Sequence, residues 1–454
     1  MKYIYLFLIP ILFSCSSTQK TATIEPVPVA PSWVQQKPIE SFYYSGIGMA
    51  IKSGNNYQAI AKNNALNDLA SEISVQINST SVLYQVESNE QFREDFRANT
   101  RMSSIENIEG FELVDSFENG REFWVYYRLS KSEYLALKKA REEMAVSRAL
   151  DLYSKAREFK LNNQYDDALI YGVKSIEAIK AYLGEGLKIN LDGQDIYLGN
   201  ELFSFLNETV NDINIRSVLG DFEITRGKVP DPTQLTFSVS TEKFSILRDI
   251  PIYFYYSGNR IKNNELFSDY NGMVSYPLGK ITSKNPREYL QANLNLVGIS
   301  KEATEDPFVR KLVAKISGSD ARINLTVKKP LVFIKSAELN FNDTLTTKAL
   351  ANTFKKEFLE SAFQVTNNVK NADYLLDITS NTDRISSSGG FFSASLDANM
   401  KFYDNQLNLL YTYQINNLKG VQLDYEKAGK DAYQKASEQI EKLIFRQLRR
   451  KVFD

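Results

Sequence analysis

The feature that most constrains the fold is that the chain of 454 residues contains a single cysteine, Cys15. No disulfide can form within the chain, so each folded part must be stabilised by burial of apolar side chains. Apolar residues make up 43% of the sequence and aromatic residues 12%, which is enough for real hydrophobic cores. At the usual domain size, a chain of this length corresponds to roughly three or four domains.

The N-terminal segment has the pattern of a secretory signal peptide. Lys2 supplies a positive charge, and the apolar run that follows is too short to span a membrane as a mature helix. The run leads into Leu12-Phe13-Ser14-Cys15, which resembles a lipobox, the site where a diacylglycerol is attached to a cysteine thiol before cleavage. We therefore expect residues 1–14 to be a signal peptide and Cys15 to be the lipidation site. The alternative is an ordinary cleaved signal peptide beside a chance cysteine.

Residues 15–32 are expected to form a lipidated tether, since their prolines favour an extended chain. Ser16 follows the cysteine, whereas Asp at that position is the usual signal for retention in the inner membrane. This pattern predicts export to the outer membrane. An acidic cluster near the cysteine sends some lipoproteins to the cell surface, but Glu25 is the first acidic residue and stands alone. We therefore expect the body to face the periplasm.

The sequence contains no histidine, which excludes an imidazole general base, a Ser-His dyad and a histidine metal ligand. With Cys15 acylated, no cysteine nucleophile or zinc thiolate site is left. The net charge of −1 gives no whole-chain attraction to nucleic acid. We expect no catalytic residue, metal, cofactor or nucleic-acid partner. Among 55 acidic residues a pair of carboxylates of the glycosidase type stays possible, although no particular pair can be nominated.

From Trp33 onward the pattern is that of a globular α+β domain. Its parts are a strand at 41–44, the run Gly46-Ile47-Gly48-Met49-Ala50, an Ala-rich helix at 58–71, a strand at 73–86, and a hairpin around Glu118-Asn119-Gly120. With the run Trp124-Val125-Tyr126-Tyr127, these features resemble the Lpp-twenty family, lipoproteins associated with the outer membrane of Gram-negative bacteria. The resemblance covers residues 33–147 and implies no catalytic residues. The two glycines lack the third glycine of a dinucleotide fingerprint, so we expect a tight backbone crossing instead.

Residues 148–218 are expected to be helical. Apolar residues recur there in two stripes: Ala149, Leu152, Ala156 and Phe159, then Tyr165, Ala168, Leu169, Val173 and Ile176. The segment 161–169 resembles one helix pair of a tetratricopeptide repeat. Because a solenoid needs about three repeats to bury a core, a helical hairpin packed on a neighbouring domain is favoured over a peptide-binding array.

Residues 219–328 change to strand periodicity and predict an antiparallel β-sandwich. The candidate strands are 222–224, 235–239, 252–256, 272–276, 290–296 and 323–327. The stretch 268–274 resembles the turn and strand of bacterial immunoglobulin-like modules, which act as spacers or docking surfaces.

Residues 329–454 predict an α+β domain with helices on one face of a small sheet. The expected elements are strands at 331–334, 372–378, 396–402 and 409–413, a helix bearing Leu350, Phe354 and Phe358, and a terminal helix over 428–448. The order resembles periplasmic lipoprotein domains that activate penicillin-binding proteins or build curli-type pores.

Two candidate binding features lie in this last region. Residues 386–390 predict a flexible loop that ends in Phe391 and Phe392, a possible partner-binding pair because exposed phenylalanines leave apolar surface uncovered. The alternative is that one of them starts a strand and packs inward. The second feature is a basic group at the chain's last helix: Arg446, Arg449, Arg450 and Lys451. These cations could contact phosphate groups, but they are also expected from the helix dipole alone.

The sequence thus predicts a multi-domain α+β protein that is anchored in the membrane through the lipid on Cys15. Its expected role is that of a non-catalytic scaffold or assembly factor at the outer membrane, with envelope proteins or peptidoglycan as partners. The alternative is a protein that binds or hydrolyses peptidoglycan or another glycan through carboxylates.

Overall fold

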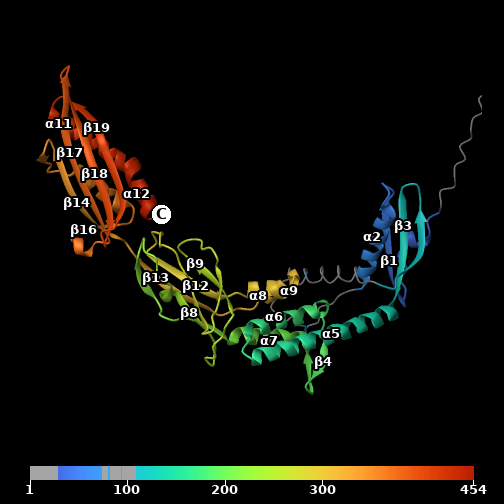
Figure 1. Cartoon of the computed structure of the whole chain (residues 1–454). Coiled ribbons are helices and arrows are strands. Elements are labelled where there is room, and N and C mark those ends of the chain that lie inside the picture. Colours follow the sequence, from blue (N-terminus) through green and yellow to red (C-terminus); the bar gives the residue numbers. More distant parts are fainter. Residues whose placement is uncertain (1–28, 74–79, 82–93, 95–108, 454) are drawn as a thin grey trace, which may run out of the picture. The chain divides into compact units, whose positions relative to one another are not determined.

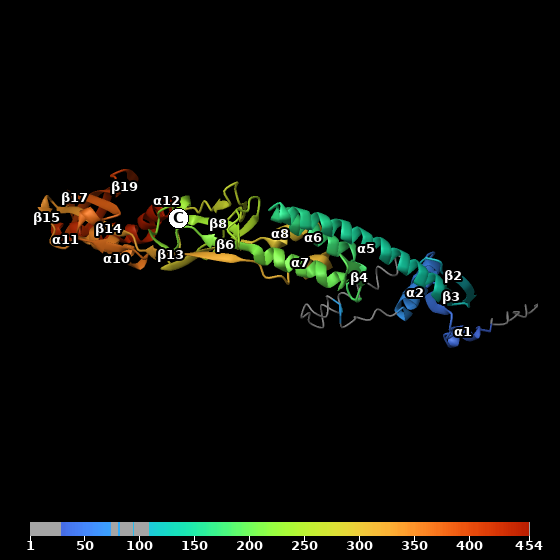
Figure 2. The same cartoon turned by 90° about the horizontal axis from the view of Figure 1, so that it is seen from below.

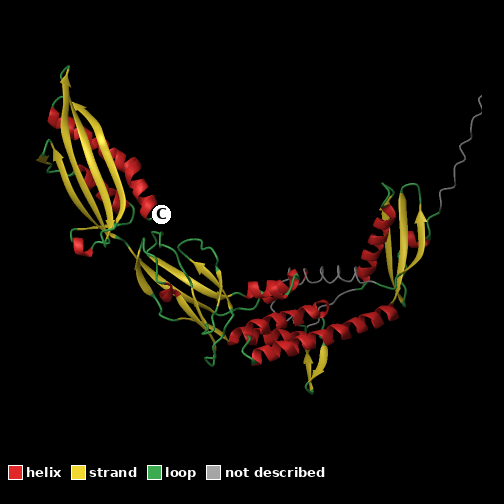
Figure 3. Ribbon diagram, in the orientation of Figure 1, coloured by secondary structure: helices red, strands yellow, loops and turns green. Residues whose placement is uncertain are grey.

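The computed structural model describes residues 29–73, 80–81, 94 and 109–453 (Figure 1). The chain contains several distinct sheets together with helices, some of which pack on a sheet (Figure 3). This arrangement confirms the predicted multi-domain α+β class. The described residues fall into two compact units, one ending and the other beginning within the long helix α5, at residues 143 and 144. Cys15, most of the tether and most of the predicted strand at 73–86 lie outside the described residues.

The first unit contains a three-stranded antiparallel sheet in the order β1-β3-β2. Its elements are α1 (Ser32–Gln35), β1 (Tyr43–Ile51), α2 (Tyr57–Glu72), β2 (Glu112–Glu118) and β3 (Glu122–Ser130). The predicted hairpin is confirmed, and the Asn119 side chain accepts hydrogen bonds from the N–H groups of Arg121 and Glu122 at 2.8 and 2.7 Å. Trp33 donates to Asp115 of β2 at 2.8 Å, which ties α1 to the sheet.

Gly46 and Gly48 allow α2 to lie directly on β1. A Cβ atom added to Gly48 would stand 2.0 Å from the carbonyl oxygen of Ala61, and one on Gly46 would stand 2.3 Å from that of Ala65. Any side chain at either glycine would therefore push the helix away. Ala61 and Ala65 are fully buried at this contact, so the predicted tight backbone crossing is confirmed.

The second unit begins with helices. Helices α5 (Lys131–Leu161), α6 (Tyr165–Ala178) and α7 (Leu198–Asp212) lie side by side (Figures 1 and 2). Ring contacts of Phe159 with Tyr171 and of Tyr153 with Phe205 join α5 to the other two at centroid distances of 5.0 and 5.3 Å. A short turn η1 (Lys180–Tyr182) and a hairpin of β4 (Lys188–Leu191) and β5 (Gln194–Tyr197) interrupt the region that the sequence predicts to be wholly helical.

A further difference from the sequence prediction is a pair of helices within the segment expected to be all β. After strand β12 (Arg287–Leu294), the helices α8 (Leu296–Ala303) and α9 (Pro307–Val313) follow and pack on α6. Asn295 caps α8 by accepting from the N–H of Gly298 at 2.9 Å, and Asp306 caps α9 at 2.9–3.0 Å. These capping residues, together with Pro307 at the start of α9, cause the chain to leave the sheet.

Two sheets pack face to face in the β-rich part. The five-stranded sheet has the order β10-β9-β12-β13-β7 and the three-stranded sheet β11-β8-β6. Phe237 of one sheet contacts Phe254 of the other at 5.8 Å. The strands are β6 (Ile213–Ser217), β7 (Phe222–Thr225), β8 (Thr236–Thr241), β9 (Pro251–Tyr256), β10 (Glu265–Phe267), β11 (Met273–Ser275), β12 (Arg287–Leu294) and β13 (Asp320–Lys328), with a short helix η2 (Pro232–Leu235). The β7–β13 pair is parallel, so the expectation of a purely antiparallel sandwich is wrong. The likeness to immunoglobulin-like modules stays a prediction.

The C-terminal domain is a sheet in the order β15-β14-β17-β18-β19, with β16 also beside β14, and its helices pack on one face. Its elements are β14 (Leu331–Asn340), β15 (Asp343–Thr344), α10 (Ala349–Glu360), β16 (Gln364–Thr366), η3 (Val369–Asn371), β17 (Tyr374–Ser388), β18 (Phe391–Asp404), β19 (Leu409–Gln422), α11 (Tyr425–Gln439), the π-helical η4 (Ile440–Ile444) and α12 (Phe445–Val452). Six phenylalanines fill the core between sheet and helices: Phe354, Phe358, Phe363, Phe402, Phe445 and Phe453.

Strands β1 and β19 are edge strands among the described residues, and each lies beside a helix whose polar side chains reach its outward backbone groups. The N–H groups of Ser45 and Ile47 donate to carboxylates of α2, both at 2.9 Å. The N–H of Val421 donates to Asp431 of α11 at 2.9 Å. In both places the helix therefore satisfies donors that would otherwise be open to another strand.

Candidate interaction surface

The β17–β18 hairpin places Phe391 and Phe392 at one end of the C-terminal domain. Ser388 pairs with Phe391, and only Gly389 and Gly390 lie between the strands, with φ angles of 60° and 78°. Two positive φ angles are characteristic of a type I′ turn, whose twist matches that of the strands. The predicted flexible loop at 386–390 is therefore a two-residue turn, because the serines before it continue β17. Both phenylalanines belong to β18, and neither is in the buried core.

Four exposed apolar side chains gather at this end, which we call the apolar end: Ile385, Phe391, Val421 and Leu423. Their exposed fractions lie between 36% for Val421 and 65% for Leu423, with 55% for Phe391. Ser393 pairs with Val421, so the alternation of strands puts Phe391 and Val421 on the sheet face opposite the helices, and Leu423 follows directly after the end of β19. The break in strand pairing between Arg384 and Ser386 leaves Ile385 unpaired.

Phe392 points to the helix side and belongs to an aromatic cluster that supports the apolar end. Its ring lies 4.8 Å from that of Tyr425, which in turn lies 6.1 Å from Phe341. The Arg384 guanidinium lies 5.1 Å from the Tyr425 ring and 5.3 Å from the Phe341 ring. Contacts of a cation with ring faces are attractive, so Arg384 links the hairpin to both rings. Phe391 thus projects from a fixed support.

The first residues of α11 are held by charge as well as by ring contacts. Asp424 caps the helix and accepts from the backbone N–H of Lys427 at 2.7 Å. The pKa of the Asp424 carboxyl lies below its ordinary value, first because the Lys427 side chain hydrogen-bonds to it and then because of that backbone N–H. The carboxylate therefore stays charged at the helix N-terminus, where a negative charge is favourable.

Phe341 occupies a backbone conformation that a bulky residue rarely adopts. Its φ is 53°, and that of Asn342 is 72°. Conformations of this kind cost about 1–3 kcal/mol and need support from their surroundings. The hydroxyl of Thr382 supports this turn. It accepts a hydrogen bond from the N–H of Phe341 at 3.1 Å and donates one to the side-chain oxygen of Asn340 at 2.6 Å. The turn therefore holds the Phe341 ring against Tyr425.

A fully buried carboxylate, Glu338, lies in the same domain and serves the fold. It accepts hydrogen bonds from the N–H groups of Leu350 and Ala351 at 3.0 and 2.9 Å and from the hydroxyl of Ser336 at 2.7 Å. These bonds satisfy orphan donors in the first turn of α10. In the part of the chain that the structure describes, no group of acidic or other ligating side chains could hold a metal ion.

The basic residues of the last helix lie away from the apolar end. α12 buries Phe445, Leu448 and Val452 in the core, while Arg446, Arg450 and Lys451 are exposed on its other side. Lys280 donates to the carbonyl oxygen of Val452 at 2.7 Å, as expected for a cation at a helix C-terminus. The helices of the described residues include none with the length and apolar character needed to cross a bilayer.

Comparison with known proteins identifies no family for this chain. No family model matches it, and no curated protein matches it. Among solved structures it is similar to a putative neuraminyllactose-binding hemagglutinin homolog from Helicobacter pylori, at 14% identity and a TM-score of 0.17, over 27% of this chain and 94% of that one. It is also similar to a minor lipoprotein from Acinetobacter baumannii, at 16% identity and a TM-score of 0.18, over 24% of this chain and 90% of that one. Similarities at such TM-scores assign neither fold nor function, and the resemblance to the Lpp-twenty family stays a prediction.

Proposed function

We propose that this chain is a non-catalytic, lipid-anchored scaffold or assembly factor of the outer membrane, and that its C-terminal domain binds an envelope protein through the apolar end. The observation that carries the proposal is the group of exposed apolar side chains around Phe391 on a fixed aromatic support. Exposed apolar groups on a rigid scaffold are typical of protein-binding surfaces. Such a surface needs no catalytic residue, in keeping with a sequence that lacks histidine.

The position of the apolar end supports this role. The sandwich contacts the opposite end of the C-terminal sheet, where Arg226 lies 4.4 Å from the Phe363 ring and a Cβ on Gly227 would stand 3.0 Å from the Tyr374 hydroxyl. Tyr374 begins β17 and Ser388 ends it, 15 residues in all, so the apolar end lies about 45 Å from this contact. A partner could therefore bind there without touching the sandwich.

The anchor is proposed from the sequence around Cys15. The apolar run, the lipobox-like residues and the Pro-rich tether together favour a lipidated N-terminus on the inner leaflet of the outer membrane, with the body in the periplasm. Cys15→Ala should abolish stable attachment, because a diacylglycerol with an added N-acyl chain is the anchor and one chain alone binds only marginally. Membrane fractionation after a salt wash measures this. A variant that stays in the membrane fraction would contradict the lipid anchor.

The partner-binding proposal is tested by photo-crosslinking in cells from a reactive residue placed at position 391. We expect a discrete adduct with one envelope protein and loss of that adduct when Leu423→Ser is added. Phe42→Ser is the matched control, because Phe42 is an exposed phenylalanine of the first unit. Neither serine variant should change the free energy of unfolding by more than about 0.5 kcal/mol. An adduct that persists in the Leu423→Ser variant would overturn the proposal.

A further inference from the structure

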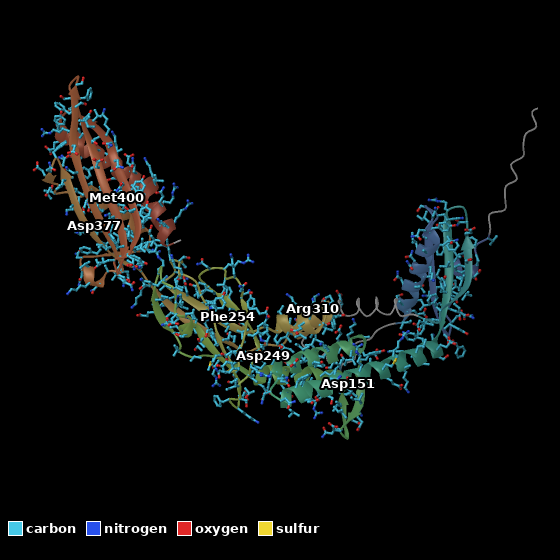
Figure 4. All side chains as sticks on the ribbon, viewed as in Figure 1. Asp151, Asp249, Phe254, Arg310, Asp377 and Met400 are labelled. Atoms are coloured by element: carbon cyan, nitrogen blue, oxygen red, sulfur yellow. The ribbon has the colours of Figure 1, made fainter. Side chains whose placement is uncertain are left out.

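The outer face of the five-stranded sheet carries tyrosines and amides in neighbouring positions. Alternate residues of β9, β12 and β13 point away from the core, and we call the following group the tyrosine face: Tyr253, Tyr255, Tyr289, Gln291, Asn293 and Arg322. The register pairs Tyr255 with Gln291 and Tyr253 with Asn293. Phe254, labelled in Figure 4, lies between the two tyrosines of β9 and is fully buried, which fixes the outward direction of its neighbours.

The rings of this face lie on two neighbouring strands, β9 and β12, and the guanidinium of Arg322 extends the group to β13. The Tyr255 and Tyr289 centroids are 5.8 Å apart, and the Arg322 guanidinium lies 4.0 Å from the Tyr289 ring. Tyr253 and Tyr255 are 41% and 48% exposed, which is high for large aromatic side chains on a sheet. Their open ring faces form a platform on which a flat apolar surface could pack.

The polar side chains beside the rings are already fixed by hydrogen bonds. The amide nitrogen of Gln291 donates to Asn293 and to Asp320, both at 3.0 Å, and Arg322 donates to the amide oxygen of Gln291 at 2.9 Å. Such a network limits side-chain motion before any ligand arrives, so less conformational entropy is lost on binding. Asn293 also donates to the carbonyl oxygen of Tyr253 at 3.3 Å, which leaves its second N–H and lone pairs on the two amide oxygens for the polar groups of a ligand.

Two pockets adjoin the tyrosine face, and both include Tyr253 and Asn264 in their walls. One has a volume of about 680 Å³, combines an apolar wall containing Leu294 and Ile316 with Asn293, Glu265 and Lys301, and is closed by the start of α8. The other, of about 1000 Å³, follows residues 253–264. Both volumes fall in the range of small-molecule sites. Glu265 accepts from Asn295 at 2.7 Å, so its carboxylate is held beside the first pocket.

We propose that the tyrosine face and its two pockets bind a glycan chain of N-acetylated amino sugars. The C–H groups on the face of a pyranose ring pack on the tyrosine rings, and sugar hydroxyls bond Gln291, Asn293 and Glu265. An acetamido group fits the first pocket, with its methyl on the apolar wall and its carbonyl toward Lys301. The site goes beyond the protein-binding role of the apolar end and does not depend on it.

The charges of this surface favour a neutral sugar over a polyanion. Arg322 stacks on Tyr289, Asp320 precedes it by two residues on the same strand, and Glu265 lies in the wall of the first pocket. A nucleic acid or polyphosphate needs several unopposed cations along its backbone, which this arrangement does not provide. Aromatic rings with amides and a carboxylate instead match the alternating apolar and hydroxyl surfaces of a saccharide.

The test is calorimetric titration of the full-length protein with N-acetylglucosamine oligomers and, separately, with glucose oligomers. We expect binding of the acetylated oligomers only, and a loss of affinity of about tenfold or more in both Tyr253→Ala and Asn293→Ala. Tyr270→Ala is the matched control, because Tyr270 is 79% exposed in the same sandwich but lines neither pocket. Its affinity should equal that of the unaltered protein.

Co-sedimentation with purified peptidoglycan sacculi distinguishes the source of the sugar. Binding to sacculi that Tyr253→Ala abolishes would identify the peptidoglycan glycan strand as the ligand. Absence of binding to acetylated oligomers, equal binding of glucose oligomers, or equal losses in the Tyr253 and Tyr270 variants would overturn the proposal.

Discussion

The contact of α2 with β1 in the first unit and that of α11 with β19 in the C-terminal domain have the same construction but different surroundings. Each brings an Ala-rich helix onto an edge strand through glycine: a Cβ on Gly48 would stand 2.0 Å from the Ala61 carbonyl oxygen, and one on Gly420 would stand 2.1 Å from that of Ala428. In the first unit the buried side chains at this contact are aliphatic, such as Ala61, Ala65 and Leu69. The C-terminal domain adds a phenylalanine core. The comparison suggests a division of roles. Close backbone contact at a glycine positions the helix, whereas a core of large side chains determines how much stability the domain loses when that contact is disturbed.

The largest expected effect tests the phenylalanine core of the C-terminal domain. Phe358 contacts four other phenylalanine rings, among them Phe402 at 5.9 Å and Phe445 at 5.1 Å. Phe358→Ala should lower the free energy of unfolding of this domain by about 4 kcal/mol, because it removes apolar contacts and leaves a cavity. Denaturant unfolding followed by hydrogen exchange in β17 and β18 measures the loss. Unchanged exchange would show that the core is not what stabilises this sheet.

The second prediction tests the glycine contact of the first unit. Gly48→Ala places a methyl group against backbone atoms of α2 in the middle of β1, and we expect a loss of about 3 kcal/mol, at the upper end of the overpacking range. Gly120→Ala is the control, because nothing lies near that position and its φ is not positive. Hydrogen exchange in α2 should rise for Gly48→Ala only. Equal behaviour of the two variants would remove the basis of the comparison.

The third prediction tests whether a surrounding phenylalanine core reduces the stability lost when the glycine contact is disturbed. Gly420→Ala creates a similar clash with α11, but Gly420 lies near the end of β19, and α11 stays packed in the phenylalanine core through Tyr433 and Ala436. We therefore expect a loss of about 2 kcal/mol, smaller than for Gly48→Ala. The two free energies of unfolding are compared under the same conditions. A larger loss of unfolding free energy for Gly420→Ala than for Gly48→Ala would contradict the idea that the phenylalanine core limits the damage.

The smallest effect concerns Asp166, a partly buried carboxyl in the helical part of the second unit. Burial raises the pKa of Asp166 to about 7, and the nearby carboxylates of Glu302, Asp167 and Asp249 add to the shift. The folded chain then binds the proton more tightly than the unfolded chain, so stability falls as pH rises from about 4 to about 7. Asp166→Asn should raise stability by about 1–2 kcal/mol at pH 8, after allowance for screening by water, and by much less at pH 5.

Thermal unfolding of the Asp166→Asn and unaltered chains across this pH range measures the difference. Asp249, labelled in Figure 4, offers a control, because Asp249→Asn removes only one of the neighbouring charges and should give a smaller gain. A gain that is independent of pH would contradict a role for the titration of Asp166.

Local sequence signals predicted much of the fold. The Gly46-Ile47-Gly48 crossing and the Asn119 hairpin follow from backbone constraints that act within a few residues, and both are present. Strand β17 is much longer than predicted, because its second half, such as Thr382 and Ser386, is polar, and neighbouring strands rather than apolar periodicity keep it extended. The parallel pairing of β7 with β13 joins segments about a hundred residues apart, so no local pattern could reveal it.

The candidate surfaces were predicted only in part. Phe391 and Phe392 stood out in sequence, but their support by Arg384 and Phe341 depends on tertiary contacts. The tyrosine face gave no signal, because Ile252-Tyr253-Phe254-Tyr255-Tyr256 is apolar or aromatic at every position and the sequence does not show which rings point outward. Asn295 and Asp306 before α8 and α9 are typical helix-capping residues, but the strand-like periodicity of the surrounding sequence led us to expect strands there.

The side-chain bonds to the edge strands affect how copies of this protein behave when they are crowded. With the lipid anchor proposed above, the chains would diffuse in two dimensions, where encounters between identical sheet edges are frequent. Since α2 accepts the outward N–H groups of Ser45 and Ile47, and Asp431 accepts that of Val421, a neighbouring strand would have to displace these bonds before it could pair. At β1 and β19, therefore, edge-to-edge pairing of folded copies is opposed even at high surface density.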